Sequence, residues 1–231
     1  NGNYDGLIKA TNLFMQADSS NQLINQYNGI GYSMNKEYDR AIYRLKSLFH
    51  QGDSSFLTNY YLGASYFATG DYETAYDHLN LAYRIDSTNQ TLYYFLGKSA
   101  IYCGYQQKGI QILNNGLTKL IPKDSVLFNY YYTISHGYGA LVNYPEEIKY
   151  LKLCYKCNPG YKLALYTIAE IYDASLNDPV EAMVYYNQFL ATRPGTKTNV
   201  PANPQGASYY NAVEHRILEL KTEQESKKKK K

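Results

Sequence analysis

The sequence predicts an all-α protein, a solenoid of antiparallel helix pairs that follow one another along the chain. The prediction rests on columns of residues that recur every 34 positions. They are Tyr4, Tyr38 and Tyr72; Gly29, Gly63 and Gly97; and Leu45, Leu79 and Leu113. A fixed period of this length indicates a repeat protein in which each copy buries its apolar face only by stacking on its neighbours.

Each copy is predicted to form two helices joined by a tight turn. In residues 56–89, apolar residues at helical spacing precede Gly70-Asp71, which interrupts the chain, and a second apolar stripe begins at Ala75. Glycine is a poor helix former, yet Gly63 recurs in register. This recurrence indicates a steric role, because a small side chain lets two antiparallel backbones approach closely.

The pattern Leu62-Gly63, Tyr66, Gly70-Asp71-Tyr72, Ala75, Leu79 and Ala82 resembles the tetratricopeptide repeat, a helix–turn–helix unit. The resemblance covers most of the chain and implies a right-handed superhelical solenoid of about five repeats. The expected repeats are residues 22–55, 56–89, 90–123, 128–161 and 162–195, preceded by a half repeat at residues 1–21. Residues 124–127 form an insertion, and one extra residue lies between Tyr172 and Ala182.

The first segment, Tyr4 to Ala17, is expected to be a second helix that lacks its own first helix. Solenoid ends need polar caps, but this one would expose an apolar edge that contains Leu7, Ile8 and Phe14. We expect the chain to continue upstream of Asn1, or a partner to cover this edge.

The last segment, from about residue 207 to 225, is expected to be a capping helix with one apolar stripe. The stripe consists of Tyr210, Val213, Ile217 and Leu220. The lysine run at residues 227–231 is too short and uniform to fold and is interpreted as a solvated tail. Because a solenoid has no internal boundary, residues 1–226 are expected to form one continuous domain.

The net positive charge of the chain comes from this lysine tail. The formal net charge is +3, but without the tail lysines 18 basic and 20 acidic residues remain. The folded part therefore offers nucleic-acid phosphates no obvious attraction, and no apolar stretch is long enough to insert into a membrane. The composition, rich in tyrosine and asparagine and poor in cysteine, is similar to that of repeat proteins of bacterial envelopes. It favours the cell envelope over the cytoplasm and leaves the compartment open.

Tyrosine is the compositional outlier, with 29 residues beside no tryptophan. One column, which includes Tyr32 and Tyr66, is expected inside the helix pairs. Other columns face the concave groove in the resembled family, and the partner-binding residues that this implies are Tyr60, Tyr94, Lys98, Tyr102, Tyr132, His136, Tyr166 and Glu170. Asp173 belongs to the same groove columns. Tyrosine suits a binding surface because it is a large rigid ring with a polar tip. The same rings could instead pack between adjacent first helices, and both interpretations stay open.

Catalytic and metal-binding chemistry is sparse in the sequence. The histidines lack the spacing of metal ligands, and we expect no catalytic residues, no cofactor and no metal. Cys154 and Cys157 form a C-x-x-C motif, but Cys154 shares a small-residue column with Ala82 and Gly116. A buried structural thiol is therefore expected in place of a zinc or redox site.

The function predicted from these observations is a non-enzymatic scaffold that binds a peptide or protein segment in a tyrosine-rich groove. Relatives in the resembled family that hold acidic chaperone tails use cations at fixed groove columns, and this chain lacks them there. That difference favours a less acidic, aromatic-tolerant partner. The alternative is a structural subunit that docks through its N-terminal edge into a larger assembly, since a fold alone does not identify a partner.

Overall fold

The computed structural model describes residues 3–119, 124–194 and 204–229, and helix is the regular secondary structure found in those ranges. The chain divides into two compact parts, an N-terminal module (Asn1–Ile121) and a C-terminal module (Pro122–Lys231). The sequence suggests one continuous domain, whereas this division falls beside the insertion at residues 124–127. Each module is described separately below.

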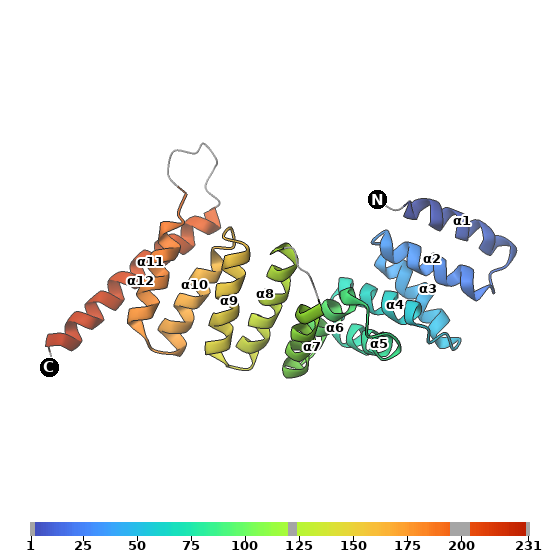
Figure 1. Ribbon diagram of the computed structural model, residues 1–231. Coiled ribbons are helices and arrows are strands. Elements are labelled where there is room, and N and C mark those ends of the chain that lie inside the picture. The colour runs from blue at the N-terminus through green and yellow to red at the C-terminus, as the bar shows by residue number, and fades with distance from the viewer. Residues whose placement is uncertain (1–2, 120–123, 195–203, 230–231) are drawn as a thin grey trace. The chain divides into compact units, whose positions relative to one another are not determined.

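The N-terminal module consists of one unpaired helix followed by three antiparallel helix pairs (Figure 1). The unpaired helix is α1 (Tyr4–Ala17). The pairs are α2 (Gln22–Met34) with α3 (Tyr38–His50), α4 (Phe56–Thr69) with α5 (Tyr72–Ile85), and α6 (Gln90–Tyr102) with α7 (Gln106–Lys119). Successive first helices also touch, α2 against α4 and α4 against α6.

The C-terminal module consists of two helix pairs and a long last helix (Figure 1). They are α8 (Asp124–Ala140) with α9 (Tyr144–Cys157), α10 (Leu163–Glu170) with α11 (Pro179–Ala191), and α12 (Pro204–Lys229), which packs on α11. The predicted all-α fold of sequential helix pairs is confirmed. The insertion lengthens the start of α8, and because four residues make about one helical turn, the apolar face keeps its register.

A glycine of the first helix lies directly against a leucine of the second helix in each pair of the N-terminal module. A Cβ atom on Gly63 would lie 2.7 Å from the Cγ atom of Leu79 and 3.0 Å from its backbone nitrogen. Gly29 and Gly97 have the same relation to Leu45 and Leu113. All three leucines are fully buried. The predicted steric role of the glycine column is therefore confirmed.

A first-helix tyrosine stacks on a ring of the second helix in three of the pairs. The stacked pairs are Tyr66 with His78, Tyr138 with Tyr150, and Tyr172 with Tyr185, with ring centroids 6.0, 5.6 and 5.7 Å apart. Tyr32 belongs to the same column and is buried, with the Arg40 guanidinium 5.6 Å from its ring centroid. This column lies inside the helix pairs, as expected.

The turn of each pair contains one residue with left-handed backbone geometry. Two are glycines, Gly70 (φ 87°) and Gly104 (φ 100°), whereas Lys36, Val142 and Asn177 have φ values of 64°, 57° and 51°. Glycine adopts this geometry without a clash, but a β-branched side chain is strained there. Val142 is therefore the least favourable of the turn residues.

The residue after the left-handed position caps the second helix in three pairs. The caps are Asp71, Asn143 and Asp178, whose side-chain oxygens accept bonds from backbone N–H groups of the first turn. Such caps satisfy donors that have no partner within the helix. The Gly70-Asp71 interruption is thus a left-handed residue followed by a helix cap.

The extra residue of the last repeat is absorbed by a π-helix, Ile171–Ser175, which continues α10. In the earlier repeats a backbone bond that spans five residues closes the turn, such as that from the Asp71 N–H to the Tyr66 carbonyl (3.0 Å). In the last repeat the bond spans six residues, from the Asp178 N–H to the Tyr172 carbonyl (2.7 Å). The wider turn takes up the insertion, so α11 keeps its packing register.

The last helix buries the apolar stripe that the sequence predicts, Tyr210, Val213, Ile217 and Leu220, against the C-terminal module. The helix also extends further than expected at both ends, from Pro204 to Lys229. Part of the lysine run is therefore helical. Lysine is a good helix former, and each residue added to an existing helix gains a backbone bond without a new nucleation cost. Lys230 and Lys231 lie outside the described residues.

Replacing Val142 with glycine should stabilise the protein by about 0.5–1 kcal/mol. Relief of the left-handed strain, worth about 1–2 kcal/mol, exceeds the entropy cost of a more flexible unfolded chain. Urea unfolding followed by circular dichroism measures the effect. The reciprocal control is Gly70→Val, which should destabilise, since Gly70 has open space around its Cα and only its φ angle opposes a side chain. A loss of stability in Val142→Gly would contradict the strain argument.

Candidate functional site

Ring contacts in the N-terminal module connect seven aromatic side chains that we call the aromatic face, and Tyr61 adjoins it through a contact with Tyr60 at 5.1 Å. The aromatic face consists of Phe56, Tyr60, Phe67, Tyr72, Tyr94, Phe95 and Tyr102, contributed by α4, the start of α5 and α6. Successive ring centroids lie 4.8–6.4 Å apart. These separations are those of interacting aromatic pairs, so the face is a continuous packed surface.

Tyr60 connects the first helices of two adjacent pairs. Its ring stacks on Phe56 at 5.6 Å and lies 6.4 Å from Phe95, and its hydroxyl lies 2.9 Å from the Thr91 Oγ1 atom on α6. The side chain is partly exposed. Tyr60 therefore contributes to packing between α4 and α6 while one side of its ring stays accessible.

Lys98 lies at the centre of the aromatic face. Its Nζ atom is 5.2 Å from the ring centroid of Phe67, 5.9 Å from that of Tyr94 and 5.6 Å from that of Tyr102. Tyr94, Lys98 and Tyr102 follow one another at four-residue spacing, which places them on one side of α6. Burial lowers the pKa of Lys98 below its ordinary value. Within the described ranges, no carboxylate lies within salt-bridge distance of Lys98.

Tyr132 and His136 lie on α8 of the C-terminal module, and both are exposed. The Tyr132 ring stacks on Phe128 at 6.1 Å and meets the edge of Tyr161 at 5.7 Å. Burial raises the pKa of Tyr161 to about 12, so its hydroxyl stays protonated at neutral pH. The two predicted residues therefore adjoin a second, smaller aromatic group.

Tyr166 and Glu170 are bonded to each other on α10. The Tyr166 hydroxyl donates to the Glu170 Oε1 atom at 2.6 Å, and burial raises the pKa of Tyr166. The Tyr166 ring also contacts Phe189 of α11 and Tyr209 of α12, at 5.6 and 5.1 Å. The last helix thus covers part of this tyrosine.

Asp173, another residue of the expected groove columns, binds the last helix. Its Oδ2 and Oδ1 atoms accept bonds from the Arg216 Nε and Nη2 atoms at 2.7 and 2.9 Å, and Oδ2 also accepts from the Tyr186 hydroxyl at 3.2 Å. The Asp173 side chain is only 10% exposed. The hydrogen bonds from Arg216 lower the pKa of the Asp173 carboxyl. Asp173 therefore fastens α12 to the π-helix.

The structure brings four of the eight predicted site residues into one network, namely Tyr60, Tyr94, Lys98 and Tyr102. Tyr132 with His136, and Tyr166 with Glu170, lie in two other surroundings of the C-terminal module. Sequence reasoning missed Tyr72, which contacts Phe67 and Tyr102 at 5.6 and 4.8 Å. Its position in the sequence could have indicated this contact. In a stack of antiparallel pairs, the start of a second helix, here α5, lies beside the end of the first helix of the following pair, here α6.

The N-terminal edge exposes apolar side chains, but one of the residues expected there is buried. Ile8 is buried against Tyr32 and Ala41, so its assignment to the exposed edge is wrong. At 100° per residue, Ile8 points about 120° away from Phe14 around the helix, so the two cannot share a face. Phe14 is 63% exposed and Leu13 is 68% exposed.

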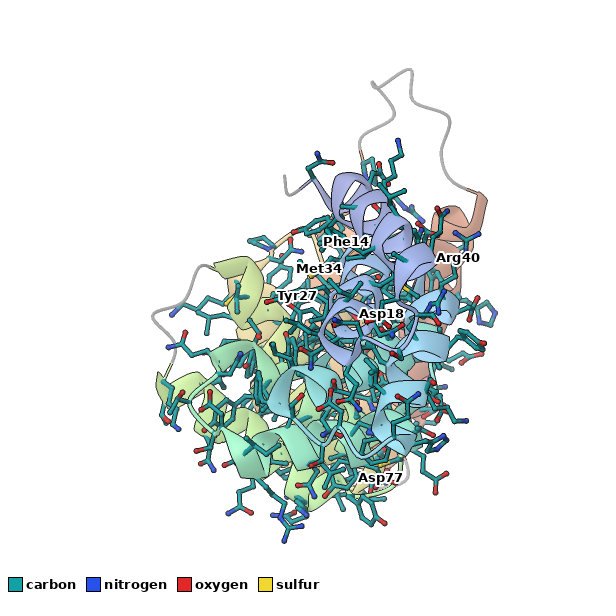
Figure 2. All side chains as sticks on the ribbon, turned by 90° about the vertical axis from the view of Figure 1, so that its right-hand side faces the viewer. Phe14, Asp18, Tyr27, Met34, Arg40 and Asp77 are labelled. Carbon is teal, nitrogen blue, oxygen red and sulfur yellow. The ribbon has the colours of Figure 1, made fainter. Side chains whose placement is uncertain are left out.

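Phe14 belongs to the uncovered end of the module. It lines an open surface hollow of about 460 Å³ with Leu13, Gln16 and Ala17. Figure 2, which views the molecule from its α1 end, places Phe14 of α1 and Met34 and Tyr27 of α2 along one side. Tyr27 and Met34 are 44% and 40% exposed, so the uncovered apolar surface extends onto α2.

The cysteines behave as structural thiols. Cys154 is fully buried, as expected, and burial raises its pKa to about 12. None of the three cysteines, Cys103, Cys154 and Cys157, forms a disulfide. Within the described ranges, no group of three or more histidine, cysteine or acidic side chains is arranged to hold a metal ion. No helix in that part of the chain is both long and apolar enough to cross a bilayer.

Comparison with known proteins agrees with the repeat pattern. A family model of the tetratricopeptide repeat matches residues 163–196, which contain the α10–α11 pair. The comparison with curated protein sequences finds no match.

Solved structures are similar over most of the chain. A crystal structure of the MamA protein is 21% identical, with 74% of this chain and 90% of that chain covered and a TM-score of 0.62. YrrB, described as a TPR protein with an unusual peptide-binding site, is 16% identical, with 82% and 95% covered and a TM-score of 0.63. A chain of the APC/C hetero-tetramer Cut9–Hcn1 is 16% identical, with 91% of this chain but 39% of that chain covered and a TM-score of 0.58.

The fold and the family match together define the class of this protein, a helical repeat protein. The match assigns residues 163–196 to the tetratricopeptide repeat, and the solved structures show that the fold of most of the chain is similar to that of proteins built from this repeat. At these identities the solved structures establish the fold alone.

Replacing Asp173 with asparagine should loosen the last helix. The change weakens two bonds to Arg216, and a hydrogen bond to a charged group is worth about 1.5–3 kcal/mol. Hydrogen exchange of the α12 amides at neutral pH should become faster. The exposed pair of Arg193 with Glu214 supplies the control, since Glu214→Gln should change exchange little.

The same bond predicts acid sensitivity of α12. Because the folded-state pKa of Asp173 is lowered, its stabilisation is present above the ordinary value of 3.8 and is lost as the pH falls through the folded-state pKa. Asp173→Asn should therefore remove part of the acid-dependent change in α12 exchange. Identical acid profiles for the two proteins would contradict this role.

Proposed function

We propose that this protein is a non-enzymatic interaction scaffold that binds a peptide or protein segment on the aromatic face of its N-terminal module. The observation that supports this most directly is the connected set of partly exposed rings around Lys98. Aromatic side chains of this kind provide large contact areas at low entropic cost, and they are enriched where binding energy concentrates.

Two features of the aromatic face favour binding over packing alone. Tyr102 is 39% exposed, although its ring lies 4.8 Å from that of Tyr72. The rings are also held by one another before any partner arrives, so a partner orders few additional side chains. Tyr60 is assigned a double role, because it also links α4 to α6.

The predicted residues of the C-terminal module belong to the same proposal. Tyr132 and His136 are exposed on α8 and are proposed to contact the partner directly. Tyr166 and Glu170 are proposed as contacts whose polar tips already bond each other. By analogy, the peptide-binding site named for YrrB supports peptide binding by a protein of similar fold.

Selection of displayed random peptides on the intact protein tests the proposal. Peptides selected on the wild type should bind at least tenfold more weakly to Tyr94→Ala and Tyr102→Ala, the loss expected when a hot-spot aromatic ring is truncated. Affinity is measured by fluorescence anisotropy of a labelled peptide. Tyr43→Ala is the matched control, because Tyr43 is 72% exposed in the same module and lies outside the aromatic face.

The proposal fails if every selected peptide binds the tyrosine variants as tightly as it binds the wild type. Thermal unfolding of each variant separates lost binding from lost folding. Stability lost without any change in affinity would instead assign Tyr94 and Tyr102 to packing.

A second function, docking through the N-terminal edge, is favoured by the exposure of Phe14. In the complete pairs its column is occupied by buried residues, namely Leu48, Ala82, Gly116, Cys154 and Phe189. The unit's own first helix contacts this column at Cys154, whose Sγ atom lies 4.0 Å from the Phe128 carbonyl of α8, and at Phe189, whose ring lies 5.6 Å from that of Tyr166 of α10. We propose that a helix of a larger assembly can occupy the same position on α1. Phe189 shows that the column accommodates a phenylalanine beneath a first helix.

A grafted helix tests whether this edge accepts one. The sequence of Gln22–Glu37, a first helix with its turn, is placed directly before Tyr4. Burial of Phe14 should raise the free energy of unfolding by about 1.5–3 kcal/mol, as measured in urea. The gain should disappear in a graft that carries Phe14→Glu. A graft that neither stabilises the protein nor protects the α1 amides from exchange would contradict edge docking.

A further inference from the structure

We propose that the aromatic face contains an anion subsite, in which Lys98 binds one carboxylate of the bound segment. The segment would be a peptide with a single acidic group flanked by aromatic or apolar residues. This inference rests on the proposed function, because it names the chemistry of the partner at the same surface.

The rings around Lys98 attract its ammonium group, but they offer it no negatively charged hydrogen-bond acceptor. Three ring centroids lie within 6 Å of its Nζ atom, which is the distance range of a cation–π interaction. Ring faces stabilise the positive charge, but an ammonium group has three N–H donors, and a carboxylate oxygen is their strongest common acceptor. A carboxylate from a partner would therefore complete the coordination of Lys98.

Partial burial of Lys98 strengthens this argument. The side chain is partly buried on the face, so its charge has lost part of its water shell. An incoming carboxylate would meet a cation in a low-dielectric surrounding, where an ion pair is stronger than at an open surface. Met at this position would keep the apolar stem over the rings and remove only the charge.

The other charged residues of the expected groove columns contrast with Lys98. Glu170 accepts a bond from the Tyr166 hydroxyl at 2.6 Å, and Asp173 accepts two bonds from Arg216 at 2.7 and 2.9 Å. The C-terminal module therefore satisfies its groove-column acids with its own side chains. Among the residues that the structure describes, Lys98 has ring neighbours and no counter-ion.

A single carboxylate fits this subsite better than a phosphate group. Among the described residues, Lys98 is the cation that lies over rings of the aromatic face. A phosphate group carries about −1.5 to −2 charges, which proteins usually bind with clusters of arginine. The sequence lacks a chaperone-tail clamp and therefore favours a less acidic partner. The single lysine among the rings leads us to propose a partner segment with one acidic group beside aromatic residues.

A peptide selection with charge variants tests the subsite. Random displayed peptides are selected in parallel on the wild type, Lys98→Met and Lys98→Glu. The wild type should enrich aspartate or glutamate at one position beside aromatic residues. Lys98→Met should keep the aromatic preference and lose the acidic one, and Lys98→Glu should enrich lysine or arginine at that position.

A double-mutant cycle then measures the pair directly. A wild-type-selected peptide and its Glu→Gln variant are titrated against the wild type and Lys98→Met by fluorescence anisotropy. The substitution in the peptide should weaken binding to the wild type about tenfold and leave binding to Lys98→Met nearly unchanged. Peptides with amidated C-termini form a separate arm, which distinguishes a side-chain carboxylate from the terminal carboxylate.

The possible results separate the two proposals. If the selected peptides depend on Tyr94 and Tyr102 but show no acidic preference, the subsite is wrong and the proposed function stands. The same conclusion follows if the Glu→Gln change in the peptide weakens binding to the wild type and to Lys98→Met equally. Peptides that bind independently of these tyrosines overturn the proposed function itself. Thermal unfolding of Lys98→Met confirms that the variant is folded.

Discussion

The close approach of the two helices in each pair is the constraint on which the rest of the structure depends. In the N-terminal module it requires a glycine opposite a buried leucine, because a Cβ atom on Gly63 would lie within 3.0 Å of the Leu79 backbone. The approach fixes the thickness of each pair, and stacked pairs then place α4 beside α6. That spacing brings Tyr60 and Phe67 into ring contact with Phe95. The candidate site is therefore a consequence of the same packing that builds the core.

The repeats, the helices and the core columns could be predicted because they are local properties of the sequence. A glycine column and a tyrosine column recur at the repeat length only if the same contact recurs in each pair. The insertion at residues 124–127 and the extra residue before Ala182 were also visible as breaks in the period. The structure accommodates these insertions with a longer α8 and the Ile171–Ser175 π-helix. Both depend on which backbone groups bond each other, and this cannot be read from the residue types.

The candidate site was only partly predictable, because its decisive contacts connect distant elements. Arg216 and Asp173 are 43 positions apart, and no periodic column links the last helix to the repeats. Tyr72 was considered only as a member of a recurring column, yet its ring contacts that of Tyr102 in the next pair. Ile8 was misplaced because apolar character was considered without its angle around α1. Each of these errors concerns the direction of a side chain, whereas the identity of the helix was right.

Charge pairing gives the two modules different chemical character. In the C-terminal module, Arg216 of α12 neutralises Asp173, and Tyr209 covers part of Tyr166, so the last helix closes that end of the repeats with its own side chains. In the N-terminal module, aromatic rings surround Lys98 but do not neutralise it. A cation surrounded by rings can still attract an anion, whereas an acid already paired with arginine has little attraction left for a further cation. The unneutralised charge, more than the number of tyrosines, therefore supports our proposal that the aromatic face binds the partner.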